Sequence, residues 1–119
     1  MRQVIKVFKA LSDETRLRIL KVLDERDELC VCEIMQALNI SQSRASRNLG
    51  FLKDAGLVSD RRDGLWVHYS LNQEKVNRYH RALNELLKNW LNGEEIVKED
   101  KERLEKAVKL GQKNVEKCR

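Results

Sequence analysis

The sequence contains 119 residues, of which 41% are hydrophobic and 36% are charged, and its formal net charge is +5. This length and composition fit one globular domain with a modest core. No apolar run approaches the roughly 20 residues that span a membrane, and the N-terminal segment lacks the apolar core of a signal peptide. We therefore expect a cytoplasmic protein without a membrane partner, and the mild basic excess suits a polyanion.

Apolar residues at helical spacing predict two helices near the N-terminus. Residues 2–11 carry an i, i+4, i+7 stripe made of Val4, Ile5, Phe8 and Leu11. A second helix is expected after Ser12, the predicted N-cap, with Asp13 and Glu14 in its first turn, where the helix dipole favours negative charge. It runs to about residue 24 and is expected to bury Leu17, Leu20 and Leu23.

A short third helix and a longer fourth helix are predicted next. The third spans about residues 30–38 and ends at Asn39. The fourth spans about residues 42–55, begins after the predicted N-cap Ser41, and faces the core with Ala45, Leu49 and Leu52. Gly56 follows at the place of a left-handed C-cap glycine. A short helix, a tight turn and a capped basic helix together indicate a helix-turn-helix.

The pattern then changes to strands. Two runs of strand-like residues flank Asp63-Gly64, and Asp-Gly between two such runs is a strong hairpin signal. Helical spacing returns over about residues 73–91, and after Gly93 it resumes over residues 94–117 with dense, nearly balanced charge. The apolar face of the first of these helices suits either the intrachain core or a dimer surface, and consists of Val76, Tyr79, Leu83, Leu86, Leu87 and Trp90.

These elements predict a mainly α fold with a small β-hairpin. The predicted architecture is a winged helix-turn-helix of order α-α-α-α-β-β-α, followed by a C-terminal helical extension. We expect a DNA-binding and dimerisation domain over residues 1–92 and a charged helical extension over residues 93–119. The sequence shows no nucleophile–base arrangement, phosphate loop or catalytic carboxylate pair, so we do not expect an enzyme.

The predicted recognition helix carries side chains suited to a DNA major groove. Glutamine can form paired hydrogen bonds to adenine and arginine to guanine, small serines let the backbone approach, and the helix N-terminus favours a phosphate. The predicted DNA-binding residues of this helix are Ser41, Gln42, Ser43, Arg44, Ser46 and Arg47. Arg61 and Arg62 of the wing are expected to meet phosphates. The alternative is a winged-helix protein-interaction module whose charged helix face is only solvated.

Cys30 and Cys32 lie two residues apart in "ELCVCEI". Thiolates suit soft ions such as As(III), Sb(III) or Cd(II). Residues i and i+2 of a regular helix point about 200° apart, so both sulfurs can reach one ion only if the first helical turn unwinds or never forms. Cys118, the remaining thiol, is a tentative third ligand. The alternatives are small core residues, or a redox or persulfide sensor using the same cysteines.

The segments "ALSDETRLRILKVL", "ELCVCEI", "SQSRASRNLGFLKDAGLV" and "DGLWVHYSL" resemble the ArsR/SmtB family of metalloregulatory repressors over roughly residues 4–91. The cysteine segment is similar to the arsenical-responsive branch. The resemblance implies a homodimer joined by the first and last core helices, and a repressor that leaves double-stranded operator DNA when As(III) or Sb(III) binds. The family pattern has a third cysteine where this sequence has Met35, and often a recognition-helix histidine where it has Asn48, so the third ligand and the operator sequence stay open.

Overall fold

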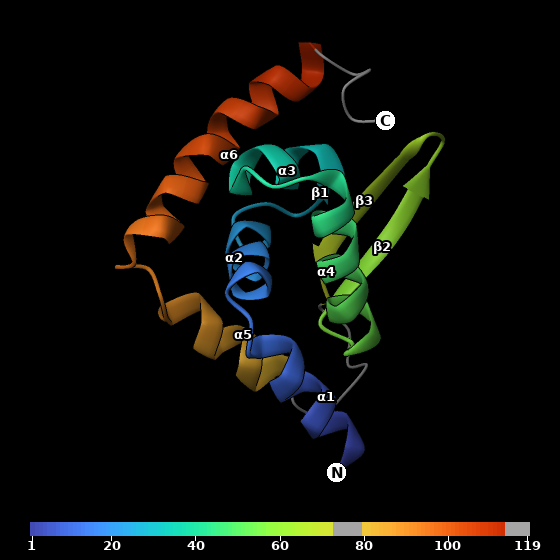
Figure 1. The fold of residues 1–119 in the computed structure, drawn as a ribbon, viewed down its shortest axis with the longest axis vertical. Coiled ribbons are helices and arrows are strands. Elements are labelled where there is room, and N and C mark those ends of the chain that lie inside the picture. The colour runs from blue at the N-terminus through green and yellow to red at the C-terminus, as the bar shows by residue number, and fades with distance from the viewer. Residues whose placement is uncertain (73–79, 114–119) are drawn as a thin grey trace.

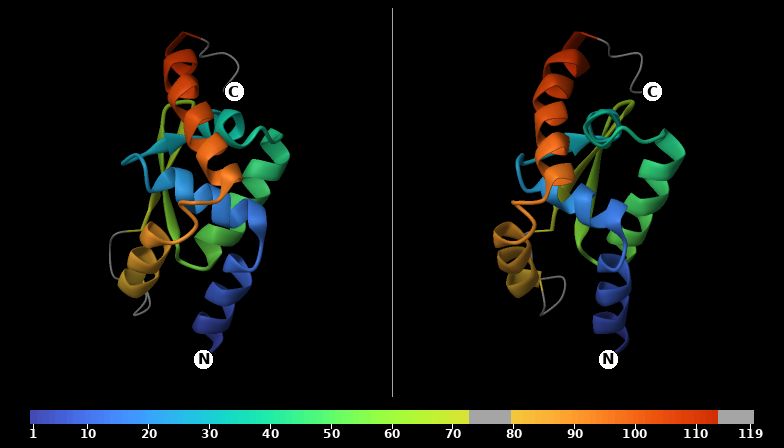
Figure 2. Two further views of the ribbon diagram at one scale, coloured as in Figure 1. Left: turned by 90° about the vertical axis from the view of Figure 1, so that its left-hand side faces the viewer. Right: turned by 60° about the vertical axis from the view of Figure 1, so that its left-hand side comes forward.

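The computed structural model describes residues 1–72 and 80–113 of the chain. It confirms the predicted fold class, because helices surround a small antiparallel sheet whose hairpin projects as a wing (Figure 1). Figure 2 shows the C-terminal helix lying along one side of the helix-turn-helix. The elements in chain order are α1 Arg2–Leu11, α2 Glu14–Leu23, β1 Leu29–Cys30, α3 Val31–Leu38, α4 Gln42–Asp54, β2 Val58–Asp63, β3 Trp66–Leu71, α5 His80–Asn89 and α6 Glu95–Lys113.

The boundary between α1 and α2 differs by one residue from the prediction. Asp13, and not Ser12, is the N-cap of α2, because its extended backbone lets its carboxylate accept the backbone N–H of Arg16 at 3.1 Å. Ser12 instead ends α1 and donates its hydroxyl to the Lys9 carbonyl at 2.8 Å. The predicted core face of α2 is confirmed at Leu20 and Leu23, whereas Leu17 is only partly buried.

Only part of the apolar stripe of α1 faces away from the core of the single chain, because Leu11 packs against the core. Val7 and Ala10 are buried, whereas Ile5 is exposed and 63% of Phe8 is accessible. The helix therefore packs through its small residues and leaves a hydrophobic face uncovered. An exposed apolar face of this kind is more often an interaction surface than an ordinary solvated helix face.

The helix-turn-helix agrees closely with the sequence-based expectation. Cys30 is the N-cap of α3, and Asn39 ends that helix with a left-handed φ of 56°. Ser41 caps α4 by accepting the backbone N–H of Arg44 at 3.2 Å, and Gly56 follows with a φ of 77°. The core between α2, α3 and α4 is closed by aliphatic side chains that include Ile19, Ile34, Leu38, Leu49 and Leu52.

The sheet contains a short strand that the sequence analysis did not predict. β1 pairs with β3, which also pairs with β2, so the strand order is β1-β3-β2. The hairpin loop lies one residue later than expected, at residues 64–65, because Asp63 still pairs with Trp66. Gly64 takes a φ of 64° at the first loop position, which is the position where a two-residue type II′ turn requires glycine.

The two C-terminal helices contact different parts of the core. In α5, Leu83 and Leu87 are buried but Leu86 is exposed, and Trp90 directly after the helix is also exposed, so the predicted apolar face divides between core and surface. Val76 and Tyr79 lie outside the described residues. α6 packs against α2 and α3 through the buried residues Val97, Leu104 and Ala107. The division into residues 1–92 and 93–119 stays a prediction. In the described part of the chain, none of the helices is apolar and long enough for a membrane span.

Candidate nucleic-acid interface and thiol site

One face of α4 is polar and accessible along its whole length. Gln42, Ser43, Ser46 and Arg47 are exposed, while the opposite face of the helix is buried through Ala45, Leu49 and Leu52. A side chain added at Gly50 would meet open space. The exposed polar face is therefore continuous and carries none of the residues buried in the protein core. Such a face suits a groove of B-DNA.

Arg44 and Asn48 join this helix to α2. The guanidinium of Arg44 donates to the hydroxyl of the buried Thr15 at 2.8 Å. The Asn48 amide donates to the Arg44 carbonyl at 2.9 Å and accepts from the guanidinium of Arg16 at 3.3 Å. Asn48 is therefore a buried residue that braces α4 against α2.

Arg16 is an organising residue that the sequence analysis missed. Its guanidinium donates to the carbonyls of Ala10 and Lys9 at the end of α1, at 2.7 and 3.0 Å. It also lies over the ring of Phe51 in α4, 4.8 Å from the ring centre. These contacts connect α1, α2 and α4. No local pattern in the sequence predicts them.

In the wing, the two predicted arginines differ. Arg61 donates from Nε and Nη2 to the two carboxylate oxygens of Glu28, at 2.9 and 2.7 Å, and lies 3.9 Å from Asp63. This guanidinium holds the pKa of the Glu28 carboxyl below its usual range. Arg62 is exposed, and within residues 1–72 and 80–113 it forms no ion pair. Both side chains belong to β2, as the predicted wing requires.

The two neighbouring cysteines lie where the sheet meets the helix-turn-helix; Cys30 is a free thiol, whereas Cys32 is disulfide-bonded. Cys30 is the last residue of β1 and has extended backbone angles, whereas Cys32 is already inside α3. The angular separation expected for two residues of one regular helix therefore does not apply, because the helix begins after Cys30. Both residues are buried, with 6% and 3% of their surfaces accessible.

Local hydrogen bonds and burial have opposite effects on the pKa of the Cys30 thiol. Its sulfur accepts the backbone N–H of Glu33, whose carboxylate in turn accepts the backbone N–H of Cys30 at 3.0 Å. This is a capping box with a thiol in place of a hydroxyl. Burial outweighs the stabilising N–H groups and raises the pKa of Cys30 to about 11. Cys30 is therefore a protonated thiol at neutral pH.

The rest of the predicted ligand set is not tested. Cys118 lies outside the described residues. The amide of Gln36 donates to the sulfur of Cys32 at 3.0 Å. Within residues 1–72 and 80–113, no three His, Cys, Asp or Glu side chains gather in a way that would hold a metal ion.

A buried ionic cluster supports the other end of α3. Asp100 of α6, with 1% of its surface accessible, accepts two hydrogen bonds from Arg18 at 2.8 and 2.9 Å and one from Arg103 at 2.7 Å. The same arginines donate to the last carbonyls of α3: Arg18 to Leu38 and Arg103 to Ala37, both at 2.8 Å. The only sign of this cluster in the sequence is Asp100 itself, an aspartate at a core-facing position of the apolar stripe of α6.

A buried lysine fixes α5 in a similar way. The ammonium of Lys21 donates to the Leu87 carbonyl at 2.6 Å and to the Asn92 side chain at 2.8 Å. Its position at the C-terminal end of α5 is electrostatically favourable, although burial lowers the pKa of the ammonium group. Lys21 thereby ties α2 to the region between α5 and α6.

The chain is similar to known regulatory proteins in sequence and in fold. The family described as "Bacterial regulatory protein, arsR family" matches residues 13–60. The chain is 48% identical over 88 residues to the arsenic resistance transcriptional regulator ArsR2 of Pseudomonas putida, covering 71% of this chain and 76% of that protein. It is 52% identical over 68 residues to the arsenical resistance operon repressor of Escherichia coli, covering 57% and 58%.

Two further matches extend the comparison. The cadmium resistance transcriptional regulatory protein CadC homolog of Staphylococcus aureus is 45% identical over 75 residues, covering 63% of this chain and 62% of that protein. The homodimeric winged helix-turn-helix DNA-binding domain Mb0332 of Mycobacterium bovis superposes with a TM-score of 0.61 at 36% identity, covering 71% of this chain and 78% of that one. The match therefore spans less than two thirds of the Escherichia coli and Staphylococcus aureus proteins.

Proposed function

We propose a function from one premise: this chain belongs to the ArsR family of bacterial regulatory proteins. Its relatives are transcriptional regulators, and its fold is their winged helix-turn-helix. We infer that it acts as a metalloid-responsive repressor in the cytoplasm. A homodimer binds operator DNA and is released when As(III) or Sb(III) binds its cysteine thiols.

The observation that carries the proposal is the position of Cys30 and Cys32 across the start of α3. The sulfur of Cys30 belongs to the sheet, and that of Cys32, which is disulfide-bonded in this structure, belongs to the helix that packs directly on α4. Inducer binding therefore requires the reduced form of Cys32. Drawing both sulfurs to one arsenic atom changes how α3 leaves the sheet, and the recognition helix moves with it. An inducer of this kind binds the form with low DNA affinity more tightly, as linkage requires.

The chemistry of Cys30 favours arsenous acid over a divalent cation. Protonated thiols condense with As(OH)₃ and release one water for each As–S bond, so three thiols give As(SR)₃ and three waters without a net proton change. A divalent ion such as Cd(II) requires the thiolate and displaces its proton. The raised pKa of Cys30 therefore penalises Cd(II) but not As(III). Cys118 is the proposed third ligand.

Two alternatives are less well supported. A redox or persulfide sensor is favoured by Cys32, which is disulfide-bonded in this structure. Such a sensor also needs an accessible thiol with a low pKa, whereas Cys30 is buried and its pKa is raised. A protein-interaction module without DNA affinity leaves the exposed polar face of α4 without a role. A cadmium-responsive repressor is the remaining competitor, because one relative is a cadmium resistance regulator.

The test is fluorescence anisotropy of a labelled duplex from the promoter upstream of the gene. Binding is measured under strong reductant and titrated with As(III), Sb(III), Cd(II) and Zn(II) in turn. Release at near-stoichiometric As(III) or Sb(III) is expected, and Cys32→Ser is expected to bind the duplex normally but to resist release. Release of that variant by As(III) contradicts the thiol site, while Cys118→Ser tests the third ligand.

A further inference from the structure

We propose that Glu28 is a positioning residue that holds Arg61 of the wing away from DNA phosphates, and that this ion pair links the thiol site to the wing. The inference rests on the proposed function, because it assigns a mechanism to part of the release of DNA. The ion pair lies outside the recognition helix, and through it the sheet takes part in the release of DNA.

The geometry of the pair is specific. Both oxygens of the Glu28 carboxylate accept from one guanidinium, at 2.9 and 2.7 Å, in the side-by-side arrangement that is the strongest for this pair of groups. Asp63 adds a second carboxylate 3.9 Å from the same guanidinium. Arg61 is therefore occupied by the protein's own acidic groups, while its neighbour Arg62 is not paired with any described residue.

The register of the sheet connects this pair to Cys30. His68 of β3 lies directly opposite Cys30 of β1 on one side and opposite Arg61 of β2 on the other. The three residues form one row across the sheet, and residues directly opposite each other share a face. Glu28 immediately precedes β1. The Glu28–Arg61 pair thus spans the sheet beside the strand that ends in the proposed ligand.

A consequence for DNA binding follows from this arrangement. Arg61 must leave Glu28 before it can contact a phosphate, so the pair competes with DNA for the same guanidinium. Ligation of Cys30 fixes the end of β1 and with it the position of Glu28, which favours the paired form. The wing then contributes one cation fewer to the phosphate backbone, and the affinity for DNA falls.

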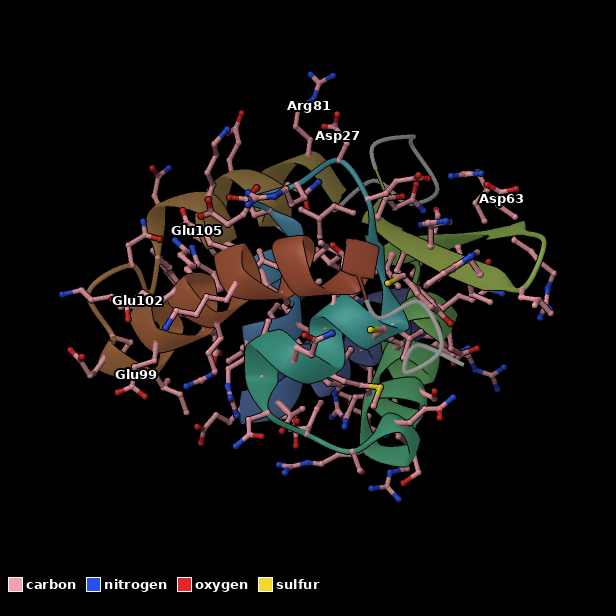
Figure 3. All side chains as sticks on the ribbon, turned by 90° about the horizontal axis from the view of Figure 1, so that it is seen from above. Asp27, Asp63, Arg81, Glu99, Glu102 and Glu105 are labelled. Carbon is pink, nitrogen blue, oxygen red and sulfur yellow. The ribbon has the colours of Figure 1, made fainter. Side chains whose placement is uncertain are left out.

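The test compares Glu28→Gln with Asp27→Asn by duplex anisotropy over a range of salt concentrations. Both variants remove one negative charge from the same loop. Asp27 is exposed (Figure 3) and has no ion pair among the described residues. We expect Glu28→Gln to bind about two- to fivefold more tightly and to steepen the plot of log K against log salt by about 0.9, the value for one added phosphate contact.

Arg61→Ala distinguishes the pair from a general charge effect. In the Arg61→Ala background, adding Glu28→Gln is expected to give neither the gain in affinity nor the steeper salt slope. The affinity ratio without and with As(III) is expected to be smaller in Glu28→Gln than in Asp27→Asn. Equal salt slopes for the two variants, or a gain that survives Arg61→Ala, overturns the inference. A wild-type protein that binds DNA but ignores As(III) contradicts the proposed function alone, because the salt slopes are read without inducer.

Discussion

Cys30 sets a pH dependence that distinguishes two kinds of inducer. Its pKa of about 11 keeps the thiol protonated at neutral pH. Binding of a divalent ion must remove that proton, so the Cd(II) affinity is expected to rise by up to about tenfold per pH unit between about pH 6 and 8. Condensation with As(OH)₃ retains the proton balance, so the As(III) affinity is expected to stay nearly constant.

The measurement is an inducer titration at several pH values, with calorimetry in two buffers of different ionisation enthalpy to count released protons. Cys30→Ser is the matched control and is expected to lose most of the pH dependence for Cd(II). An As(III) affinity that climbs as steeply as that for Cd(II) contradicts the assignment of a protonated thiol.

Arg47 is the α4 arginine whose side chain is left free for base recognition. Arg44 is already held by Thr15, whereas Arg47 is exposed on the same face as Gln42 and Ser43. Arg47→Ala is expected to weaken specific duplex binding by about 1–3 kcal/mol and to leave As(III) affinity unchanged. Arg26→Ala, in the loop after α2, removes the same charge elsewhere. Equal losses in both variants at matched salt would mean that Arg47 acts only through its charge.

At the scale of elements, α6 is a structural support for α3. Asp100 lies between Arg18 and Arg103, and these arginines occupy the last carbonyls of α3. Asp100→Asn leaves a buried guanidinium without its counter-charge, so the free energy of unfolding is expected to fall by about 3 kcal/mol. Urea denaturation measures this change.

Glu102→Gln provides the comparison on the same helix. Glu102 points away from the body of the protein (Figure 3), and a surface change of this kind is expected to stay within about 0.5 kcal/mol. Equal stability of Asp100→Asn and Glu102→Gln would remove the structural role of the ionic cluster.

An element could be predicted from the sequence when the residues that determine it lie within or next to it. The limits of α3 and α4 follow from side chains at their own ends, such as Ser41, Asn39 and Gly56, and these were predicted. β1 has only two residues and exists because β3 lies beside it, so no periodicity revealed it. The cap of α2 was misplaced because Ser12 and Asp13 are both good caps, and the backbone angles choose between them.

The same distinction applies to the candidate site. Residue types and helical spacing were enough to gather the exposed face of α4 and to single out the adjacent thiols. They were not enough to find Arg16 or Arg18, whose partners lie on other helices. Sequence also could not show that Arg61 is held by Glu28, because the two residues are 33 positions apart.

At the scale of the whole molecule, uncovered apolar side chains gather at one end. Ile5 and Phe8 of α1, Leu86 of α5 and Trp90 directly after α5 are exposed. Both helices lie at the end of the molecule opposite the far end of α6 (Figures 1 and 2). We expect this surface to join two copies of the chain; the similar Mycobacterium bovis domain is a homodimer. Phe8→Glu is expected to shift the protein toward monomer and to weaken operator binding.

Sedimentation equilibrium measures the oligomeric state directly. Leu65→Glu, at the exposed wing loop, introduces the same charge on a similarly accessible apolar residue and is expected to leave the dimer intact. A Phe8→Glu variant that remains dimeric at low micromolar concentration would move the interface elsewhere.

The ionic cluster under α3 also affects the order in which the protein becomes structured during synthesis. Arg18 and its partner Asp100 are 82 residues apart, and a ribosome adding about 5–20 residues per second separates their appearance by roughly 4 to 16 s. In the later part of that interval, after Asp54 has been added, α4 is complete, while α3 beneath it still lacks the support of Asp100 and Arg103. A nascent chain, or one released before α6, therefore carries the exposed polar face of α4 without the ionic cluster that supports α3. Competence to hold DNA is acquired late in synthesis.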